Sequence, residues 1–188
     1  MHLVVGLGNP GPEHARNRHN VGFMVVERLA ESAGERLREK LQGRFAKTRL
    51  AGEPVVLLEP LTYMNHSGES VQRAMRFFDV PLERVLVVHD ELDLALGTLR
   101  LKRGGGVAGH NGLASVVKHC GGPDFMRLRV GIGRPEQGTV RRHVLSDFSS
   151  GEGATLEDVL TQATRAVEAV VADGIDPAMN ALHARPRD

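Results

Sequence analysis

The sequence predicts an α/β fold: a single domain with three layers, in which a twisted mixed β-sheet is flanked by helices. Three observations favour it. Short aliphatic runs, such as residues 3–7 and 85–88, alternate along the chain with amphipathic segments of helical period. Two further strand-like runs are separated only by a turn, which adds an antiparallel hairpin to the alternating order. The 188 residues suffice for one well-packed core but not for two, so we expect one domain over residues 1–188.

The first half of the chain is expected to hold two strand–helix units with the hairpin between them. In order, the elements are a strand at 3–7, a helix at 21–33, hairpin strands at 44–50 and 55–58, and a helix at 67–79. Gly34 stops the first helix, and residues 51–54 form the hairpin turn. Ser67 is expected to cap the second helix, because its hydroxyl can accept from an unpaired backbone N–H.

The second half continues the alternation. It is expected to contain strands at 85–88, 98–103 and 127–132, a short helix that ends at His119, a helix at 155–173, and a last helix opened by Asp176 and Pro177. In the strand at 98–103, Leu99 and Leu101 alternate with Arg100 and Lys102. The strand at 127–132 repeats this pattern with Arg127 and Arg129. Both strands should therefore be half-buried, with a basic face.

The charge distribution indicates a polyanionic partner. The net charge is only +1, but residues 94–145 hold nine Lys and Arg against two Asp and Glu, whereas residues 151–188 hold three against seven. A basic segment of this kind is typical of a surface that meets nucleic acid, with solvated surface charge as the alternative.

Composition argues against membrane and disulfide-bonded classes. No apolar run has the length of a bilayer, and residues 1–20 carry Gly, Pro and His where a signal peptide would be apolar. The single cysteine, Cys120, cannot form an internal disulfide, which fits a reducing cytoplasm. We therefore expect a cytoplasmic protein with an inert structural thiol.

Polar clusters follow the strand-like runs. They lie at Gly8 to Asn20, Thr62 to Gly68, His89 to Asp93, and Gly104 to Gly112. Ligands of open α/β sheets bind beyond the carboxyl ends of the strands. The four clusters are therefore expected to converge on one cleft.

Four of the six asparagines are expected at this cleft, two of them directly after a histidine. They are Asn9, Asn20, Asn65 and Asn111. A carboxamide both donates and accepts, so it can position a water, hold a peptide backbone or donate to an oxyanion. Asn also favours turns for purely conformational reasons, but four such placements at strand ends favour a functional interpretation.

Asp90 directly follows an apolar strand, which makes it a candidate to orient the imidazole of a distant histidine. The other ring nitrogen could then take a proton from water. A metal site built from residues 89–93 with His19 and His110 is the alternative, although no His-Glu-x-x-His spacing supports it. Gly6, Gly8 and Gly11 match the dinucleotide fingerprint formally, but no helix begins among them. We expect neither a metal nor a nucleotide cofactor.

Six motifs in one order resemble those of the bacterial peptidyl-tRNA hydrolases. They are Gly6-Leu7-Gly8-Asn9-Pro10-Gly11, Arg18-His19-Asn20-x-Gly22, Thr62-Tyr63-Met64-Asn65-x-Ser67-Gly68, His89-Asp90-Glu91-Leu92-Asp93, Gly109-His110-Asn111-Gly112-Leu113 and Arg127-Leu128-Arg129-Val130-Gly131-Ile132-Gly133. The resemblance runs from Met1 to about Ala184. It implies a cytoplasmic, monomeric, metal-independent esterase that cleaves the ester between a peptide and the 3′ ribose of tRNA.

The resemblance also implies roles for individual residues. His19 would be the general base, Asp90 would orient it, and Asn9 would support the site. Asn65 and Asn111 would position the water, the substrate carbonyl and the peptide backbone. The clamp for the tRNA 5′-phosphate would fall on Lys102 and Arg129. The other substrate or tRNA contacts would be His14, Tyr63, Met64, Arg100 and His110.

Three positions depart from the family pattern. His14 stands where an aromatic Tyr or Phe is usual, Asn17 where Thr is usual, and Ala114 where Lys or Arg is usual. An RNA-binding module without catalysis remains the rival class. Such a module, however, does not need a His–Asp pair among carboxamides, and it usually displays aromatic platforms that this sequence lacks.

Overall fold

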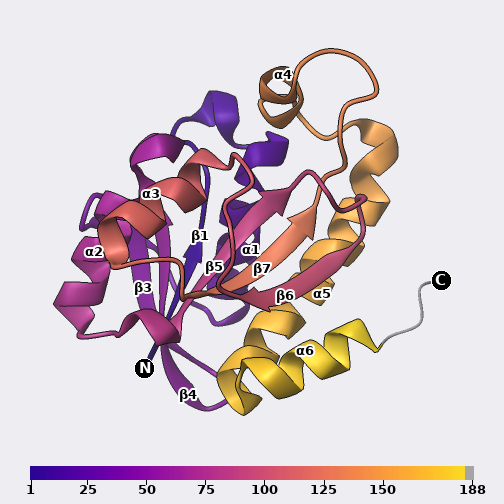
Figure 1. The fold of residues 1–188 in the computed structure, drawn as a ribbon. Coiled ribbons are helices and arrows are strands. Elements are labelled where there is room, and N and C mark those ends of the chain that lie inside the picture. The colour runs from indigo at the N-terminus through magenta and orange to yellow at the C-terminus, as the bar shows by residue number, and fades with distance from the viewer. Residues whose placement is uncertain (185–188) are drawn as a thin grey trace.

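The computed structural model describes residues 1–184 and places seven strands in one mixed sheet (Figure 1). Its order is β2-β3-β4-β1-β5-β7-β6. The strands are β1 (His2–Gly6), β2 (Arg38–Lys40), β3 (Gly43–Leu50), β4 (Glu53–Pro60), β5 (Val85–Glu91), β6 (Leu99–Arg103) and β7 (Met126–Gly131). The central strands β4, β1, β5 and β7 are parallel, and the outer pairings are antiparallel. The predicted mixed sheet is confirmed, and residues 185–188 of the expected domain lie outside the described residues.

Helices cover both faces of this sheet. The helices α1 (Val21–Ser32) and α5 (Gly153–Asp173) pack on one face, and α2 (Ser67–Phe78) and α3 (Asn111–Cys120) pack on the other (Figure 1). The last helix, α6 (Ile175–His183), packs beside β6. Strand residues alternate between two aliphatic cores, so that Leu86 and Val88 face α1 while Val85 and Val87 face α2 and α3. This confirms the three-layer architecture. No helix among the described residues combines the length and apolarity needed to cross a membrane.

The predicted hairpin is present, and its turn is shorter than expected. Only Ala51 and Gly52 connect β3 to β4, with φ angles of 50° and 79°. Positive φ at both central residues matches the twist of the flanking strands. Strand β2 was not predicted, because its residues are charged and exposed on both sides. A second tight turn, through Leu41 and Gln42 at φ 61° and 56°, joins it to β3.

Three helix starts differ from the expectation. Ser67 is the first residue of α2 rather than its cap, because a 3₁₀ turn (Met64–His66) precedes it and its hydroxyl donates to the Met64 carbonyl at 2.8 Å. Helix α6 begins at Ile175, directly after Gly174, so Asp176 lies inside its first turn. The short helix α4 (Val140–Val144) was not predicted. The Thr139 hydroxyl caps it by accepting from the Arg142 N–H.

The segment from Gly104 to Gly112 reaches the other polar clusters by an unexpected route. Strand β6 runs antiparallel to β7, so it ends where β7 begins, and the Gly104 N–H donates to the Phe125 carbonyl. The loop then returns along the sheet to the start of α3. Arg127 supports this loop, because its guanidinium donates to the carbonyls of Gly105 and Pro123 at 2.9 and 3.1 Å. The expectation that four strands end together is therefore wrong for β6, and Arg127 is buried rather than part of an open basic face.

Candidate active site

Two glycines bring His19 to the end of the sheet. A Cβ at Gly6 would lie 2.2 Å from the Gly22 carbonyl oxygen, and one at Gly22 would lie 2.4 Å from the Val88 carbonyl oxygen. The start of α1 can therefore sit directly against β1 and β5 only because both positions lack a side chain. This contact explains Gly6 of the dinucleotide-like pattern as a packing requirement. It also places His19, three residues before Gly22, beside the end of β5.

Asp90, at the end of β5, joins two imidazoles. Its Oδ2 lies 2.7 Å from His19 Nδ1, and its Oδ1 lies 2.7 Å from His110 Nε2. The carboxylate is buried, whereas the two histidine side chains remain 12% and 11% exposed. The ring centroids of His19 and His110 are 5.1 Å apart. The sequence predicted that Asp90 orients one histidine, whereas in the structure Asp90 is bonded to two.

The hydrogen-bond partners assign the protons of both rings. His110 Nδ1 accepts from the Gly112 N–H at 3.1 Å and from the Leu113 N–H at 3.3 Å, so its proton is on Nε2 and is donated to Asp90. His19 donates from Nδ1 to the other carboxylate oxygen. His19 Nε2 has no protein partner among residues 1–184, and the ring lines the cleft. It is therefore positioned as a proton acceptor for a group in the cleft.

The electrostatics of the cluster keep Asp90 ionised. Burial alone would raise the pKa of its carboxyl, but the His110 and His19 imidazoles outweigh it and hold the pKa well below the usual range. Burial, together with the neighbouring His110, lowers the pKa of His89 to about 3. His89 is consequently a neutral ring, and its Nδ1–H donates to the Asp90 backbone carbonyl at 2.8 Å.

Two asparagines hold the first polar cluster together. The Asn9 N–H donates to Asn20 Oδ1, and Asn20 Nδ2 donates back to the Asn9 carbonyl, both at 2.9 Å. Asn9 Oδ1 accepts from the Met64 N–H at 2.8 Å, which directs Asn9 Nδ2 toward the cleft. Asn20 is thus a buried structural residue, whereas Asn9 presents a donor.

Asn65 and Asn111 line the same cleft from two different elements. Both line the cleft and are exposed, and neither side chain has a hydrogen-bond partner among the described residues. Met64 is buried next to them, and its sulfur would lie 2.5 Å from a Cβ at Gly112. Glycine at position 112 is therefore required for the close approach of α3 to Met64.

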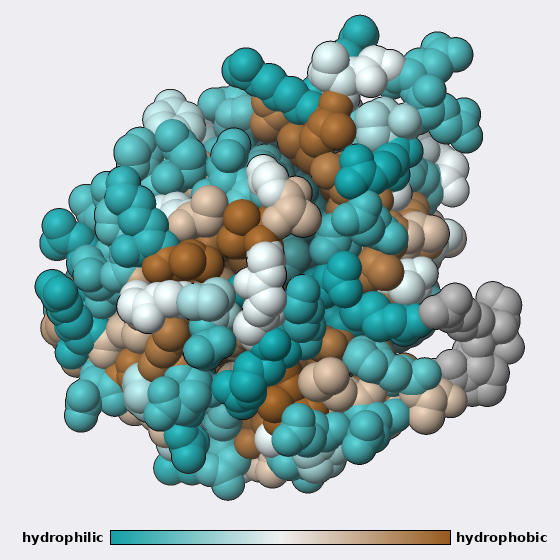
Figure 2. All heavy atoms as spheres, viewed as in Figure 1, coloured by the Kyte–Doolittle hydropathy of each residue, from teal (hydrophilic) through white to brown (hydrophobic). Residues whose placement is uncertain are grey.

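These groups surround one open cleft of about 1070 Å³. Most sequence-predicted site residues line it: Asn9, His19, Tyr63, Met64, Asn65, Asp90, Lys102, His110, Asn111 and Arg129. Val140, Arg141 and Val144 of α4 form a further wall that the sequence did not predict. In Figure 2, hydrophobic residues gather near α4 and in the region of α3, with hydrophilic residues between them.

One end of the cleft is basic, and two of the arginines that line the cleft, Arg129 and Arg134, form ion pairs. Arg129 Nε donates to Glu91 Oε1 at 2.8 Å, which leaves the two terminal nitrogens of the guanidinium without a partner among the described residues. Arg134 donates to Asp93 Oδ1 from both Nε and Nη2, at 2.9 and 2.7 Å. Lys102 has no ion pair in residues 1–184. Its side chain lies over the Gly105 backbone, where an added Cβ would be 2.5 Å from Nζ. Lys102 and Arg129, to which the resemblance assigns the phosphate clamp, therefore both line the cleft.

Two predicted contacts lie outside the cleft. His14 Nδ1 pairs with Asn17 Oδ1 at 2.9 Å, and Asn17 Nδ2 donates to Asp147, which ties this turn to the segment after α4. Arg100 Nη1 bonds only its neighbour's carbonyl, that of Leu99, at 3.2 Å. Neither residue lines the cleft. His14, which departs from the family pattern, therefore belongs to a turn outside the cleft. The buried Asn17 links this turn to Asp147.

The same cluster offers the only metal-like arrangement found among the described residues. One ligand atom from each of His19, Asp90 and His110 lies within 4.8 Å of the others. Both imidazole nitrogens of this set, however, carry the protons that bond Asp90. An ion there would have to displace both protons and break the arrangement that directs His19 Nε2 into the cleft.

Sequence reasoning missed three features of the site: the bond from His110 to Asp90, the Glu91–Arg129 pair and the wall from α4. Each depends on residues far apart in the sequence. One local signal was available. Thr139 before two arginines is a helix-capping pattern, and it could have indicated α4.

Comparisons with known proteins agree with this geometry. The family model described as "Peptidyl-tRNA hydrolase" matches residues 3–188. The peptidyl-tRNA hydrolase of Sorangium cellulosum is 51% identical over 191 residues, which cover 100% of this chain and 86% of that protein. That of Mycolicibacterium vanbaalenii is also 51% identical, over 97% of this chain and 96% of the other. The crystal structure of the Acinetobacter baumannii enzyme superposes with a TM-score of 0.91 at 43% identity, over 98% of this chain and 95% of that chain. The resemblance seen in the motifs is thereby confirmed, and the chain belongs to the peptidyl-tRNA hydrolase family.

Proposed function

We propose that this protein hydrolyses the ester between the peptide and the 3′ ribose of peptidyl-tRNA, with His19 as general base. One observation carries the proposal. His19 Nδ1 is held by the buried Asp90 carboxylate at 2.7 Å, and the opposite ring nitrogen faces a cleft that the carboxamides of Asn9, Asn65 and Asn111 also line. This is the arrangement expected for activating water without a covalent intermediate.

During the reaction, His19 takes one proton from water and later returns it to the leaving group. Nε2 takes a proton from water as the oxygen attacks the ester carbonyl, and the Asp90 carboxylate stabilises the imidazolium that forms. Donors from the asparagines stabilise the negative charge on the carbonyl oxygen. When the tetrahedral intermediate collapses, the ribose 3′ oxygen leaves and takes the proton from Nε2. The products are a free peptide and a tRNA with an intact 3′ hydroxyl.

The basic end of the cleft suits the RNA part of the substrate. Lys102 supplies an ammonium, and Arg129 supplies two terminal nitrogens that can donate to a phosphate side by side. We assign these residues to the tRNA 5′-phosphate. Asn65 and Asn111, whose carboxamides are unpaired, are assigned to the peptide group next to the ester.

We also infer that the enzyme acts as a monomer in the cytoplasm. Both edges of the sheet are protected against pairing with a second chain. At β6, the Leu101 N–H donates to His183 Nε2 of α6 at 3.1 Å. At β2, every residue is charged and exposed. The buried Cys120 thiol, whose pKa is raised to about 12 by burial, suits a reducing compartment in which it stays unmodified.

The test is turnover of an N-acetylated aminoacyl-tRNA, with the released acid and the tRNA 3′ end both identified. We expect hydrolysis at the ester, unaffected by a strong chelator, and much slower hydrolysis of the same aminoacyl-tRNA without the acetyl group. Binding without turnover would favour the RNA-binding module, and loss of turnover with the chelator would favour a metal-dependent esterase at His19, Asp90 and His110.

A further inference from the structure

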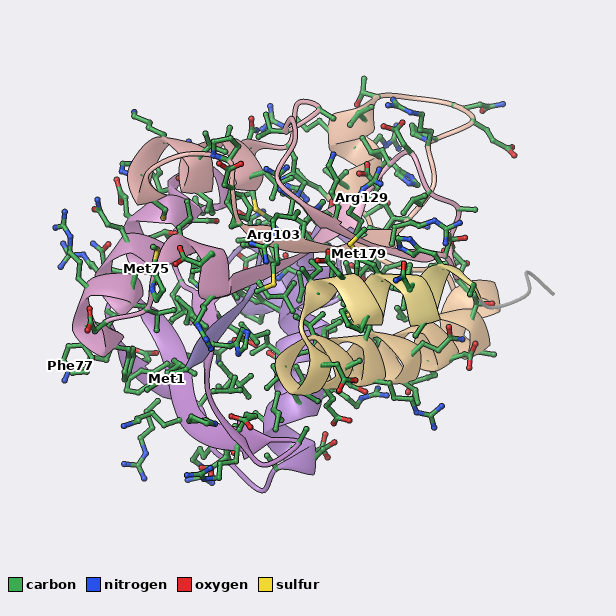
Figure 3. All side chains as sticks on the ribbon, turned by 60° about the horizontal axis from the view of Figure 1, so that its bottom comes forward. Met1, Met75, Phe77, Arg103, Arg129 and Met179 are labelled. Carbon is green, nitrogen blue, oxygen red and sulfur yellow. The ribbon has the colours of Figure 1, made fainter. Side chains whose placement is uncertain are left out.

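A second basic surface lies at the edge of the sheet opposite β6, the strand that carries Lys102. It consists of Arg38 and Lys40 on β2, Lys47 and Arg49 on β3, and Arg73 and Phe77 on α2, and we call it the β2–β3–α2 patch. All five cations are exposed, and the Phe77 side chain is 54% exposed. Figure 3 shows Phe77 on the side of the molecule away from Arg129.

The strand pairing collects the positive charges on one face. Arg38 is the register partner of Phe45, and Lys47 follows Phe45 by two residues, so Arg38, Lys40, Lys47 and Arg49 all share the face of Phe45. Glu39, the one acid of β2, is the partner of Arg44 and lies on the other face. The cations thus meet no acid from their own strands.

Helix α2 extends this face with an aromatic ring. Arg73 precedes Phe77 by one turn, on the same side of the helix. The Lys40 ammonium lies 4.4 Å from the centroid of the Phe77 ring, and Lys47 lies 6.0 Å from that of Phe78. Glu69 lies one turn before Arg73, but it pairs with His66 at 3.4 Å and forms no ion pair with Arg73 among the described residues, and Asp79 follows the helix end.

None of the five cations has an ion pair among residues 1–184, whereas Arg129 and Arg134 in the cleft are both paired. Protection of an edge strand requires charge, but it requires neither a single sign nor an aromatic ring on the neighbouring helix. Unpaired cations around a half-exposed ring are the combination that binds RNA, because the cations neutralise phosphates and the ring stacks on a base.

We propose that the β2–β3–α2 patch binds a second RNA molecule while the substrate occupies the cleft. A base stacked on Phe77 would take the place of the Lys40 ammonium, which would then contact the adjoining phosphate. From β2 to β6 there are six strand spacings of about 4.8 Å, or roughly 29 Å. Lys102 lies on β6, so this distance separates the patch from the end of the cleft that we assign to the tRNA 5′-phosphate.

The test compares two triple variants of equal charge. The patch variant is Lys40→Gln, Lys47→Gln, Arg73→Gln, and the control is Arg16→Gln, Lys118→Gln, Arg165→Gln, three exposed cations elsewhere without ion pairs among the described residues. The probe is a short single-stranded oligoribonucleotide without a 5′-phosphate, whose binding is followed by fluorescence anisotropy over a series of salt concentrations. Phe77→Ala tests the ring separately.

We expect the patch variant to bind the oligoribonucleotide at least about fivefold more weakly, and its salt slope to fall by about 2, since each phosphate contact contributes about 0.7 for a single strand. Phe77→Ala should also lose roughly fivefold or more, because stacking on one base is removed. The control, and a cleft variant with Lys102→Gln and Arg129→Gln, should bind the probe as the wild type does. The KM for peptidyl-tRNA should be unchanged in the patch variant.

Three outcomes would overturn the proposal. Equal losses in the patch and control variants would mean that only net charge matters. A raised KM for full-length peptidyl-tRNA, with unchanged hydrolysis of an N-acetylaminoacyl-CCA fragment, would assign the patch to the body of the substrate's own tRNA. Unchanged RNA binding, together with lost binding to phosphatidylglycerol vesicles, would assign it to a membrane surface.

Discussion

Asp90 holds two imidazoles that do different work. His19 directs its second nitrogen into the cleft, whereas His110 uses its second nitrogen to accept two backbone N–H groups of α3. Because both rings donate to one buried carboxylate, the carboxylate orients both imidazoles and stays ionised at the same time. The distinction between the two histidines comes entirely from what each second nitrogen faces.

The first prediction concerns the base itself. His19→Ala should lower kcat by roughly a hundredfold to ten-thousandfold, the usual contribution of a general base, while the circular dichroism spectrum stays that of the wild type. Asp90→Asn should cost less, because it keeps an oxygen that can accept from His19 Nδ1. Steady-state turnover of an N-acetylaminoacyl-tRNA measures both. A His19→Ala enzyme within a few-fold of wild type would end the assignment of this residue as the base.

The second prediction uses the pairing of Arg129 with Glu91. Lys102→Ala removes a phosphate partner and should raise KM for a 5′-phosphorylated substrate with little change in kcat. Glu91→Gln should act in the opposite direction. It keeps an oxygen for Arg129 Nε but removes the competing charge, so KM should fall by about two- to fivefold, the scale of a partly exposed ion pair. Both effects should shrink on a substrate without the 5′-phosphate. Effects of equal size on the two substrates would place these residues elsewhere along the RNA.

Among the elements, α3 connects the backbone to the chemistry. Its N-cap is His110, and its first turn carries Asn111 and the Gly112 that approaches Met64. The start of α3, the loop that returns from β6 and the Asp90 carboxylate are therefore connected through the His110 side chain. Capping and positioning by His110 can be separated by substitution.

In the third prediction, His110→Asn is compared with His110→Ala. Asparagine is a good N-cap and can accept from the same N–H groups, but its short side chain does not reach Asp90 as Nε2 does. His110→Asn should therefore keep the free energy of unfolding close to wild type and still lose kcat. His110→Ala should lose kcat and, in addition, about 0.5–2 kcal/mol of unfolding free energy for the missing cap. Urea unfolding and turnover measure the two effects. Full activity in His110→Asn would mean that the ring serves only the helix.

The fourth prediction concerns Glu59 on β4, which is fully buried and accepts from Arg44 at 2.7 Å. Burial, aided by the negative charge of Glu27 and opposed by Arg44, raises the pKa of Glu59 to about 8 from an ordinary 4.5. Because the native pKa is raised, the contribution of Glu59 to the free energy of unfolding is fully present below pH 4.5. This contribution is lost as the pH rises to about 8.

Glu59→Gln keeps an oxygen for Arg44 but cannot ionise. It should match the wild type near pH 4.5 and become the more stable protein as the pH rises, by a few kcal/mol at about 1.4 kcal/mol per pKa unit. Urea unfolding at pH 5, 7 and 9 measures the difference. A difference that does not change with pH would mean that the buried carboxyl is ionised throughout.

On the scale of the whole molecule, periodicity predicted most of the fold. Aliphatic runs gave β1, β4 and β5, alternation gave β6 and β7, and helical stripes gave α1, α2 and α5, because burial on one face leaves its period in the sequence. Strand β2 has no buried face and therefore no such signal. The direction of β6 could not be read either, since alternation is the same for a parallel and an antiparallel strand.

The site was predictable to the extent that its residues occur in motifs. His19, Asp90, Asn65 and Asn111 were found in this way, and the structure brings them to one cleft. The hydrogen-bond partners of the site residues could not be predicted. The Asp90–His110 and Glu91–Arg129 pairs join segments about 20 and 38 positions apart, and only the return of the loop after β6 and the register of β5 with β7 bring them together. Arg100 was also expected to contact the substrate, but it does not line the cleft. Strand alternation gives the face on which a residue lies but not the direction of a long side chain.

The last prediction concerns selectivity, which depends on both walls of the cleft. The enzyme must spare aminoacyl-tRNA, which has the same ester but a protonated amine in place of the peptide group. Asn65, after β4, and Asn111, at the start of α3, line the cleft, and their side chains have no hydrogen-bond partner in residues 1–184. Each can therefore pair with a peptide group that only the blocked substrate offers. A site built to hydrogen-bond a group rejects the analogue that lacks it.

Asn65→Ala and Asn111→Ala should therefore each lower kcat/KM on N-acetylaminoacyl-tRNA by the equivalent of about 1–3 kcal/mol, the cost of leaving a polar group unsatisfied. The already slow aminoacyl-tRNA should lose less, so the ratio between the substrates narrows. The two side chains lie on different elements. If each holds its own part of the peptide group, the free-energy loss in the double variant should be close to the sum of the two single losses. If both substrates slow by the same factor, the asparagines serve only the water and the oxyanion, and discrimination must come from the wall that α4 adds to the cleft.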